Sequence, residues 1–218
     1  MKILFFGDSI TDAGRNRNPE DRAKQSALGY GYVRAIGDRL IGSAPDRYTI
    51  LNMGISGNRI VDLYARIKCH LWNQEPDLVS ILIGINDIWH EITARNGVDL
   101  ERYEKVYRMI IEDTKKRLPN TKFVLCEPFV VEGSCTCPTE EMPDRYARFQ
   151  EIYGYAAVVK KLAEEYGLYF LPLQKCFDSA VEKLGASYYA PDGVHPNVGG
   201  SALIATEWVK LFREQIDK

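Results

Sequence analysis

The sequence predicts an α/β fold in which helices cover both faces of a parallel sheet. Short apolar runs, rich in β-branched and aromatic residues, alternate with longer amphipathic stretches along the whole chain. Several runs lack polar alternation, which is typical of strands buried on both faces. Regular alternation of strands with helices implies parallel strands joined by crossover helices.

Five runs are expected to be strands, and six stretches between them are expected to be helices. In the clearest helix, apolar residues recur at three- and four-residue spacings from Tyr103 to Leu118, and Pro119 ends the pattern. The expected strands are 3–6, 48–51, 78–83, 122–126 and 168–171, and the expected helices are 30–41, 60–72, 100–118, 144–166, 174–184 and 199–216.

The chain of 218 residues fits one large domain better than two small ones. No internal repeat or linker divides it, so residues 1–218 are expected to form a single domain. The long irregular segment 128–143 is interpreted as an active-site flap rather than a domain hinge.

Charge and composition exclude several classes of protein. Lys and Arg total 28 against 30 for Asp and Glu, a formal net charge of −2, so a nucleic-acid or membrane-surface partner is not expected. The most apolar run, 78–85, is too short to span a membrane, and no secretory leader is recognised, which together favour a cytoplasmic location. Five scattered cysteines do not resemble a secreted disulfide framework.

Polar and glycine-containing segments follow the expected strands. Ser9 follows the first strand, Gly57 the second and Asn86 the third, while Asp192 and His195 follow the last strand and a helix. In parallel α/β sheets the ligand site lies beyond the carboxyl ends of the strands, so these residues are expected to converge at one edge.

Together these residues fit nucleophilic acyl transfer. His195 is suited to remove the proton of Ser9, and Asp192 is suited to fix the histidine tautomer. The oxyanion of the tetrahedral intermediate needs preorganised donors, which the backbone N–H groups of Ser9 and Gly57 and the Asn86 amide are able to supply. The catalytic candidates are therefore Ser9, Asp192 and His195.

At Ser9, Gly57, Asn86 and His195 the sequence resembles the GDSL, or SGNH, hydrolase family, which is named for such residues. The resemblance spans nearly the whole chain. It implies a flavodoxin-like three-layer α/β/α sandwich with a five-stranded parallel sheet, and it implies the family's roles for these residues: Ser9 as nucleophile, the oxyanion hole at Ser9, Gly57 and Asn86, and the triad completed by Asp192 and His195.

The segments 7–12, 54–58, 80–87 and 128–133 are similar to the intracellular acetylxylan esterases of that family. This likeness implies a serine esterase that removes acetyl groups from xylo-oligosaccharides and other small sugars without a metal or cofactor. The subgroup includes homo-oligomers, so the likeness also implies a possible homo-oligomer. One departure is Pro191, because those esterases commonly have an aromatic residue immediately before the triad aspartate. Tyr188 and Tyr189, just upstream, are candidates to replace it.

Further residues are candidate substrate contacts. Trp89 and His90 are placed to wall the pocket, although a packing role is equally compatible with Trp89. Asp8 is also interpreted, with Asp87, as a brace that accepts backbone N–H bonds, and Arg59 as a solvated cation. The candidate contacts are Asp8, Arg59, Trp89, His90 and Tyr189.

Two other functions remain open on the sequence alone. The same machinery serves lipases, lysophospholipases and acyl-thioesterases, and a non-catalytic carbohydrate-binding protein is a second rival. No metal site is expected, because Cys135 and Cys137 are separated by one residue and no nearby histidine or second pair completes a set of four ligands.

Overall fold

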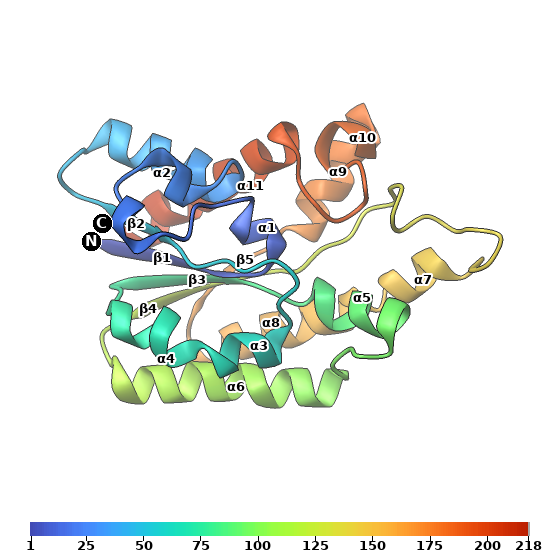
Figure 1. Ribbon diagram of the computed structural model, residues 1–218, viewed down its shortest axis with the longest axis horizontal. Coiled ribbons are helices and arrows are strands. Elements are labelled where there is room, and N and C mark those ends of the chain that lie inside the picture. The colour runs from blue at the N-terminus through green and yellow to red at the C-terminus, as the bar shows by residue number, and fades with distance from the viewer. Residues whose placement is uncertain (218) are drawn as a thin grey trace.

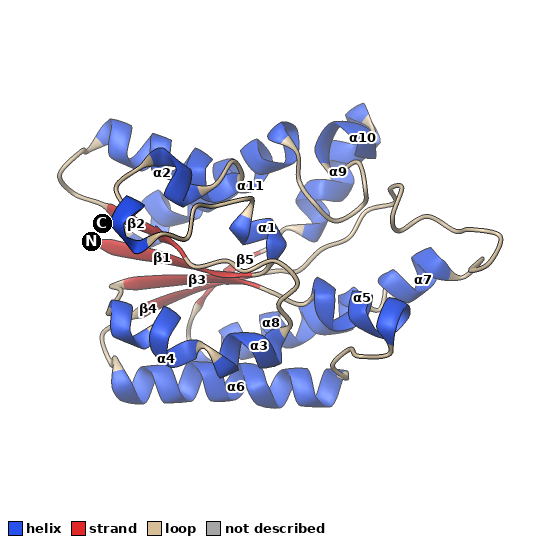
Figure 2. Ribbon diagram, in the orientation of Figure 1, coloured by secondary structure: helices blue, strands red, loops and turns tan. Residues whose placement is uncertain are grey.

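The centre of the molecule is a five-stranded parallel sheet with the strand order β2-β1-β3-β4-β5. The computed structural model describes residues 1–217. The strands are β1 (Lys2–Gly7), β2 (Thr49–Asn52), β3 (Leu78–Leu82), β4 (Lys122–Cys126) and β5 (Tyr169–Leu171). Figures 1 and 2 show the sheet edge-on between two layers of helices. The predicted α/β/α sandwich is therefore confirmed.

The register of the strands sets where the site lies. Gly7 pairs with Leu82, and Leu82 pairs with Cys126, so β1, β3 and β4 end level with one another. The chain order reverses on either side of β1, because β2 lies on one side and β3 on the other. Such a switch point opens a crevice at the carboxyl ends of the strands, where ligands of open α/β sheets bind.

Helices cover both faces of the sheet. Figure 1 shows α1, α2, α9, α10 and α11 on one face and α3 to α8 on the other. Within the layers, α2 packs against α11, and α6 packs against α3 and α8. Their bounds are α1 (Ser9–Asp12), α2 (Tyr32–Ser43), α3 (Ile60–Ala65), α4 (Ile67–His70), α5 (Ile85–Ala94), α6 (Leu100–Arg117), α7 (Arg145–Phe149), α8 (Ile152–Tyr166), α9 (Gln174–Leu184), α10 (Ala186–Tyr189) and α11 (Val198–Leu211), with a π-helical turn at Phe212–Ile216.

The central strands are buried on both faces, as their continuous apolar sequences predict. All five residues of β3 are buried, including Ser80. Its hydroxyl accepts a hydrogen bond from Trp208 Nε1 at 3.0 Å, so the one polar group of this strand is satisfied inside the core. None of the helices within residues 1–217 has the length and apolarity needed to cross a bilayer.

The expected helices occur with two differences. The helix expected over 60–72 is divided at Arg66, and the helix expected over 144–166 is divided at Gln150 and Glu151. A helix not anticipated from the sequence, α5, begins directly after β3 and contains Asn86. Gly84, at φ 141°, permits this abrupt change from strand to helix, because L-residues rarely adopt that backbone angle.

The segment 127–144 has no helix or strand, but it is fastened to the chain around Asp192. Val131 N donates to Gly193 O at 3.0 Å, Cys135 N donates to Asp192 O at 3.0 Å, and Ser134 N donates to Pro191 O at 3.0 Å. Residues 131–135 therefore brace the loop that carries Asp192 and His195, while the interpretation of 128–143 as an active-site flap stays a prediction.

Candidate active site

The structure brings Ser9, His195 and Asp192 into one hydrogen-bonded chain. Ser9 is the first residue of α1, immediately after β1, and its Oγ lies 2.8 Å from His195 Nε2. The other ring nitrogen, Nδ1, donates to Asp192 Oδ2 at 2.6 Å. This is the arrangement in which an imidazole is able to take the proton of a serine hydroxyl.

The Asp192 side chain is held by its own loop. Its Oδ1 accepts the backbone N–H groups of Val194 at 2.9 Å and of His195 at 2.7 Å, which leaves Oδ2 for the imidazole. Gly193 has φ 94°, a conformation that favours glycine, and this turn returns the chain toward the carboxylate. The aspartate-to-histidine spacing of three residues thus creates the contact between the two side chains.

The two side chains change each other's proton affinity. The hydrogen bond to Asp192 raises the pKa of His195 above its ordinary value, although burial acts in the opposite direction. Burial favours a higher pKa for Asp192, but the hydrogen bonds from His195 and the backbone outweigh it and lower that pKa. The carboxylate is therefore ionised beside an imidazole that binds its proton more tightly than a free histidine does.

This coupling predicts the pH dependence of turnover. Only neutral His195 accepts the Ser9 proton, so kcat/KM for an aryl acetate should fall as pH drops through the raised pKa, with its midpoint above the ordinary value of about 6.5. Asp8→Asn is the matched control, because burial raises the pKa of Asp8 to about 7 and its titration could also change the rate. If the fall of kcat/KM at low pH persists in this variant, the group that causes it is His195. A midpoint at or below the free-histidine value would contradict the coupling.

The predicted oxyanion donors are the backbone N–H groups of Ser9 and Gly57 and the side-chain amide of Asn86. Within residues 1–217, no acceptor is bonded to the backbone N–H of Ser9 or of Gly57. The Asn86 side chain, on the first turn of α5, donates to Asn58 O at 3.1 Å and is held at the Gly57 loop. Gly57 has φ 80°, so the left-handed backbone is the reason for glycine at this position. The unbonded N–H groups of Ser9 and Gly57, with the Asn86 amide beside the Gly57 loop, are compatible with the predicted oxyanion site, which stays a prediction.

Removing the Asn86 amide should slow the chemical step. For Asn86→Ala we expect kcat to fall by about 10²–10³-fold, because one donor to the developing oxyanion is lost. Asn120→Ala, an exposed substitution in the turn after α6, should retain the activity of the unmodified enzyme. Initial rates with an aryl acetate measure both variants, and only a twofold loss in Asn86→Ala would remove this residue from the oxyanion site.

Arg66 holds the loops of the site together, and sequence reasoning did not single it out. Its guanidinium donates to Gly7 O at 2.9 Å, to Met53 O at 2.7 Å and to Asn58 Oδ1 at 2.6 Å. It therefore links the chain at the end of β1 to the loop after β2. No local pattern marks this arginine, because each of its partners is distant in sequence.

Asp87 joins two further segments of the site, as expected for a carboxylate that accepts backbone N–H bonds. Its Oδ1 accepts Ile60 N at 3.0 Å, which joins the start of α5 to the start of α3. Asp87 is buried, and burial together with the nearby Asp8 raises its pKa well above the ordinary range. The Asn86 position is thus fixed by a neighbour within the same helical turn.

Asp8 lies beneath Ser9 and does not face the pocket. The side chain is buried, Oδ1 accepts Ile10 N at 2.9 Å, and Oδ2 has no partner within residues 1–217. Burial raises the pKa of Asp8 to about 7, although the bond from Ile10 favours a lower value. These contacts support the bracing interpretation of Asp8 and leave it no surface for a substrate.

Arg59, Trp89 and His90 are absent from the residues that line the pocket at Ser9 and His195. The Trp89 ring is 5.9 Å from the His195 ring and packs edge-on against Phe149. His90 is partly exposed, and burial with the nearby Arg59 lowers its pKa. Arg59 is already bonded to Asp62 and Asn96, so it is not the solvated cation expected.

The tyrosine expected beside Asp192 is not placed against the catalytic groups. Tyr189 packs edge-on against Tyr188, and its carbonyl accepts Asn197 N at 3.0 Å. Pro191 and Tyr189 are both absent from the lining of the pocket at Ser9. Trp89 is the aromatic side chain that adjoins the His195 ring instead.

An open pocket of about 570 Å³ lies over Ser9 and His195. Its walls include Arg15, Arg17 and Tyr30, which the sequence analysis did not nominate. Arg15 and Arg17 follow the Ser9 motif closely in the chain, so the signal that could have found them is their position in the loop after α1. We call this cavity the catalytic pocket.

The five cysteines are unpaired. Cys137 Sγ contacts Ser134 O at 3.8 Å within the segment 127–144. Within residues 1–217, no group of three or more His, Cys, Asp or Glu side chains is arranged to hold a metal ion.

Comparison with known proteins identifies the family. The pattern of the GDSL-like Lipase/Acylhydrolase family matches residues 5–203. An acetylxylan esterase from Geobacillus stearothermophilus is 36% identical over 214 residues, which cover 96% of this chain and 92% of the relative. The chain belongs to the GDSL-like lipase/acylhydrolase family. It is a carboxylic ester hydrolase of the GDSL type.

Solved structures of family members share its architecture. A protein from Parabacteroides merdae described as a GDSL-like lipase is 38% identical, with a TM-score of 0.85, over 96% of this chain and 94% of its own. The acetylxylan esterase from Geobacillus stearothermophilus is 35% identical in its solved structure, with a TM-score of 0.81, over 96% of this chain and 93% of its own. The predicted GDSL-type fold is confirmed.

Proposed function

We propose that this GDSL-type esterase removes O-acetyl groups from small carbohydrates, with acetylated xylo-oligosaccharides as substrates, through an acetyl-enzyme on Ser9. The observation that carries the proposal is the continuous chain from Ser9 Oγ through His195 to Asp192, at 2.8 and 2.6 Å. Such a chain beside free backbone donors is suited to acyl transfer.

In the first half-reaction Ser9 Oγ attacks the acetyl carbonyl while His195 Nε2 takes the hydroxyl proton. The negative charge that develops on the carbonyl oxygen is stabilised by the N–H groups of Ser9 and Gly57 and by the Asn86 amide. Asp192 stabilises the imidazolium and keeps Nδ1 protonated. The bond to the sugar oxygen then breaks, and His195 gives its proton to the departing sugar alcohol.

In the second half-reaction His195 removes a proton from water, which attacks the acetyl group on Ser9. A second tetrahedral intermediate forms against the same donors and collapses as His195 returns a proton to Ser9 Oγ. Acetate leaves, and the enzyme regains its starting state. All proton transfers use one imidazole nitrogen, so the orientation fixed by Asp192 is needed in both halves.

The relatives support both the residues and the substrate class. Structures of the acetylxylan esterase from Geobacillus stearothermophilus include catalytic mutants with a serine, an aspartate or a histidine replaced by alanine. Other structures of that protein describe it as an acetyl-xylooligosaccharide esterase. The catalytic pocket of our chain is lined by arginine and tyrosine side chains, which are able to contact sugar hydroxyls.

A substrate profile tests the proposal. Purified enzyme and Ser9→Ala are compared for acetate release from acetylated xylo-oligosaccharides and for cleavage of aryl esters of increasing acyl length. We expect Ser9-dependent release from the oligosaccharides and a preference for acetyl over longer chains, since a lipase needs an apolar trough. Ser9-dependent cleavage of long-chain esters alone would replace the carbohydrate proposal with a lipase or thioesterase activity.

A further inference from the structure

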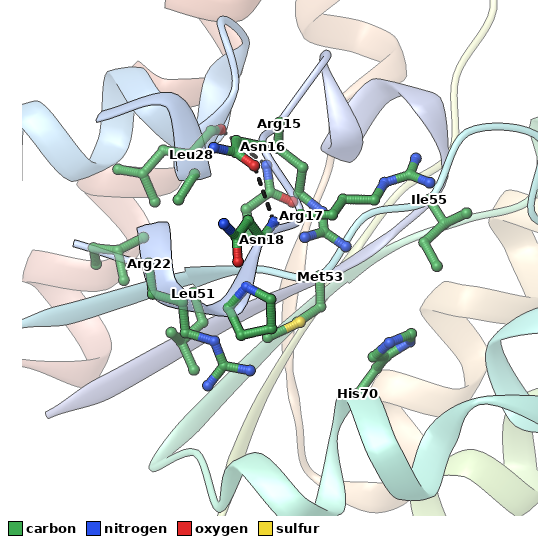
Figure 3. A pocket seen from close by; sticks show the side chains of 14 residues that line it. Arg15, Asn16, Arg17, Asn18, Arg22, Leu28, Leu51, Met53, Ile55 and His70 are labelled. Carbon is green, nitrogen blue, oxygen red and sulfur yellow. Dashed lines mark hydrogen bonds between the residues drawn. The ribbon is translucent and has the colours of Figure 1, made fainter. Parts of the chain in front are cut away.

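A second cavity adjoins the catalytic pocket at the end of β2. It has a volume of about 180 Å³, and its polar walls are Arg15, Asn16, Arg17, Asn18, Arg22, Asn52 and His70. Figure 3 shows these side chains around Met53. Arg15 and Arg17 lie above it in this view, Arg22 to its left and His70 to its lower right. Arg15 and Arg17 line both cavities, so the two cavities lie side by side and share these walls. We call the second cavity the basic pocket.

The basic pocket carries a net positive charge. No aspartate or glutamate lines it, although the whole chain has a net charge of −2. Asp12, buried behind it, pairs with Arg17 and offsets one charge. Arg15 donates through Nε to Gly54 O at 2.8 Å, and Arg22 donates to the neutral Gln74 Oε1 at 3.1 Å. Neither guanidinium is paired with a carboxylate within residues 1–217.

The proton affinity of His70 is also affected by the positive charge of these arginines. Its pKa is lowered by burial and then by four arginines, Arg66, Arg15, Arg17 and Arg22. The ring nitrogen Nδ1 lies 3.2 Å from Arg66 Nη1, which fits a neutral imidazole that accepts a hydrogen bond. The basic pocket thus presents guanidinium donors and a neutral histidine on one surface.

We propose that the basic pocket binds an anionic group, a carboxylate or a phosphate, carried by the sugar substrate whose acetyl ester lies at Ser9. This inference rests on the proposed esterase function and adds to it a preference for acetylated sugars that carry an acidic group. Guanidinium groups bind both anions through paired N–H donors, and a sugar in the neighbouring catalytic pocket would present its anionic group to the arginines that the two cavities share. The shared walls Arg15 and Arg17 connect the anion to the scissile ester.

The test uses three acetylated substrates that differ only in a substituent: a neutral sugar, a uronic acid and a sugar phosphate. We expect kcat/KM for at least one anionic substrate to exceed that for the neutral one by about tenfold, the scale of one charge-assisted hydrogen bond. Added salt should reduce this preference, because Arg17 and Arg22 are exposed. The two anionic arms identify which group the basic pocket accepts.

Arg22→Glu places a carboxylate in the basic pocket without altering a wall of the catalytic pocket. The anionic preference should disappear in this variant. Arg39→Glu is the matched control, because this substitution changes the net charge by the same amount. Arg39 is exposed on α2, and its Nη1 donates to Thr206 Oγ1 at 3.0 Å. Its anionic preference should persist. Circular dichroism verifies that both variants are folded.

Failure of this inference is distinguishable from failure of the proposed function. Ser9-dependent cleavage of all three substrates at equal rates would retain the esterase and overturn the basic pocket as an anion site. A preference that survives Arg22→Glu would also overturn it. If no acetylated sugar is cleaved, calorimetric titration with glucuronate and with inorganic phosphate tests the basic pocket alone. The inference would be contradicted if neither anion binds the unmodified enzyme, or if the anions bind Arg22→Glu equally well.

Discussion

Ser9→Ala is expected to lower kcat/KM for aryl acetates by about 10⁴-fold or more while leaving the fold intact. The Ser9 hydroxyl lies 2.8 Å from His195 Nε2, and the alanine methyl group offers no nucleophile in its place. Ser9 is only partly buried, at the rim of the catalytic pocket, so the truncation leaves no large core cavity. Product release by purified protein and a thermal melt measure the two effects.

Ser43→Ala is the matched control for this change. Ser43 ends α2, and its hydroxyl donates to Leu40 O at 2.9 Å, away from the catalytic groups. Its activity should equal that of the unmodified enzyme. Substantial turnover in a pure preparation of Ser9→Ala would exclude Ser9 as the nucleophile, whereas a lowered melting temperature would mean that the loss reflects folding.

Asp192→Asn should lower kcat by about 10⁴-fold, because the histidine tautomer is lost. The two backbone N–H groups at Asp192 Oδ1, from Val194 and His195, hold an acceptor oxygen in that position. The amide nitrogen of asparagine would then take the Oδ2 position and face His195 Nδ1 with a donor. Nδ1 must accept in that arrangement, so the ring proton moves to Nε2 and His195 can no longer take the proton of Ser9.

Steady-state rates of Asp192→Asn against Asp38→Asn separate this effect from a general loss of charge. Asp38 is an exposed partner of Arg34 on α2, and its variant should retain full activity. Near-normal rates in Asp192→Asn would instead indicate a Ser9–His195 dyad. Rescue of part of the activity at higher pH would not be expected, because the fault lies in the tautomer rather than in the charge of the imidazole.

Most of the sheet was predictable because its strands are buried on both faces. The runs at 3–6 and 122–126 were located within a residue of β1 and β4, since continuous β-branched and aromatic residues leave little alternative to a buried strand. The contact of the Asn86 amide with the loop that carries Gly57 followed from parallel topology, which brings all carboxyl ends to one edge. The short Asp192–His195 spacing predicted their contact.

Features determined by contacts distant in sequence were not predictable. The helix α5 begins only two residues after β3, so its first turn was indistinguishable from a loop. Arg66 interrupts the expected helix, and its guanidinium bonds lead back to Gly7 and Met53. Likewise, no periodicity shows on which side of Ser9 the pocket opens, and this is why Arg15 and Tyr30 were not nominated.

Within residues 1–217, the bracing of the site leaves the Ser9 and Gly57 N–H groups unbonded, while the Asn86 amide is bonded to Asn58 O. Arg66 and Asp87 satisfy their own hydrogen bonds with the backbone of the surrounding loops, which fixes the Ser9 and Gly57 segments without occupying their N–H groups. Preorganised donors of this kind need no rearrangement when the oxyanion forms, which is the main source of their catalytic effect.

The most direct test of the account is to trap the acetyl-enzyme. Rapid acid quench of the enzyme with an aryl acetate, followed by mass spectrometry of its peptides, should find one acetyl group on the peptide that contains Ser9, at the Ser9 side chain. Ser9→Ala should carry none under the same conditions. Acetylation at another residue, or turnover with no acetylated peptide and no burst of the aryl alcohol, would contradict the covalent mechanism built on Ser9, His195 and Asp192.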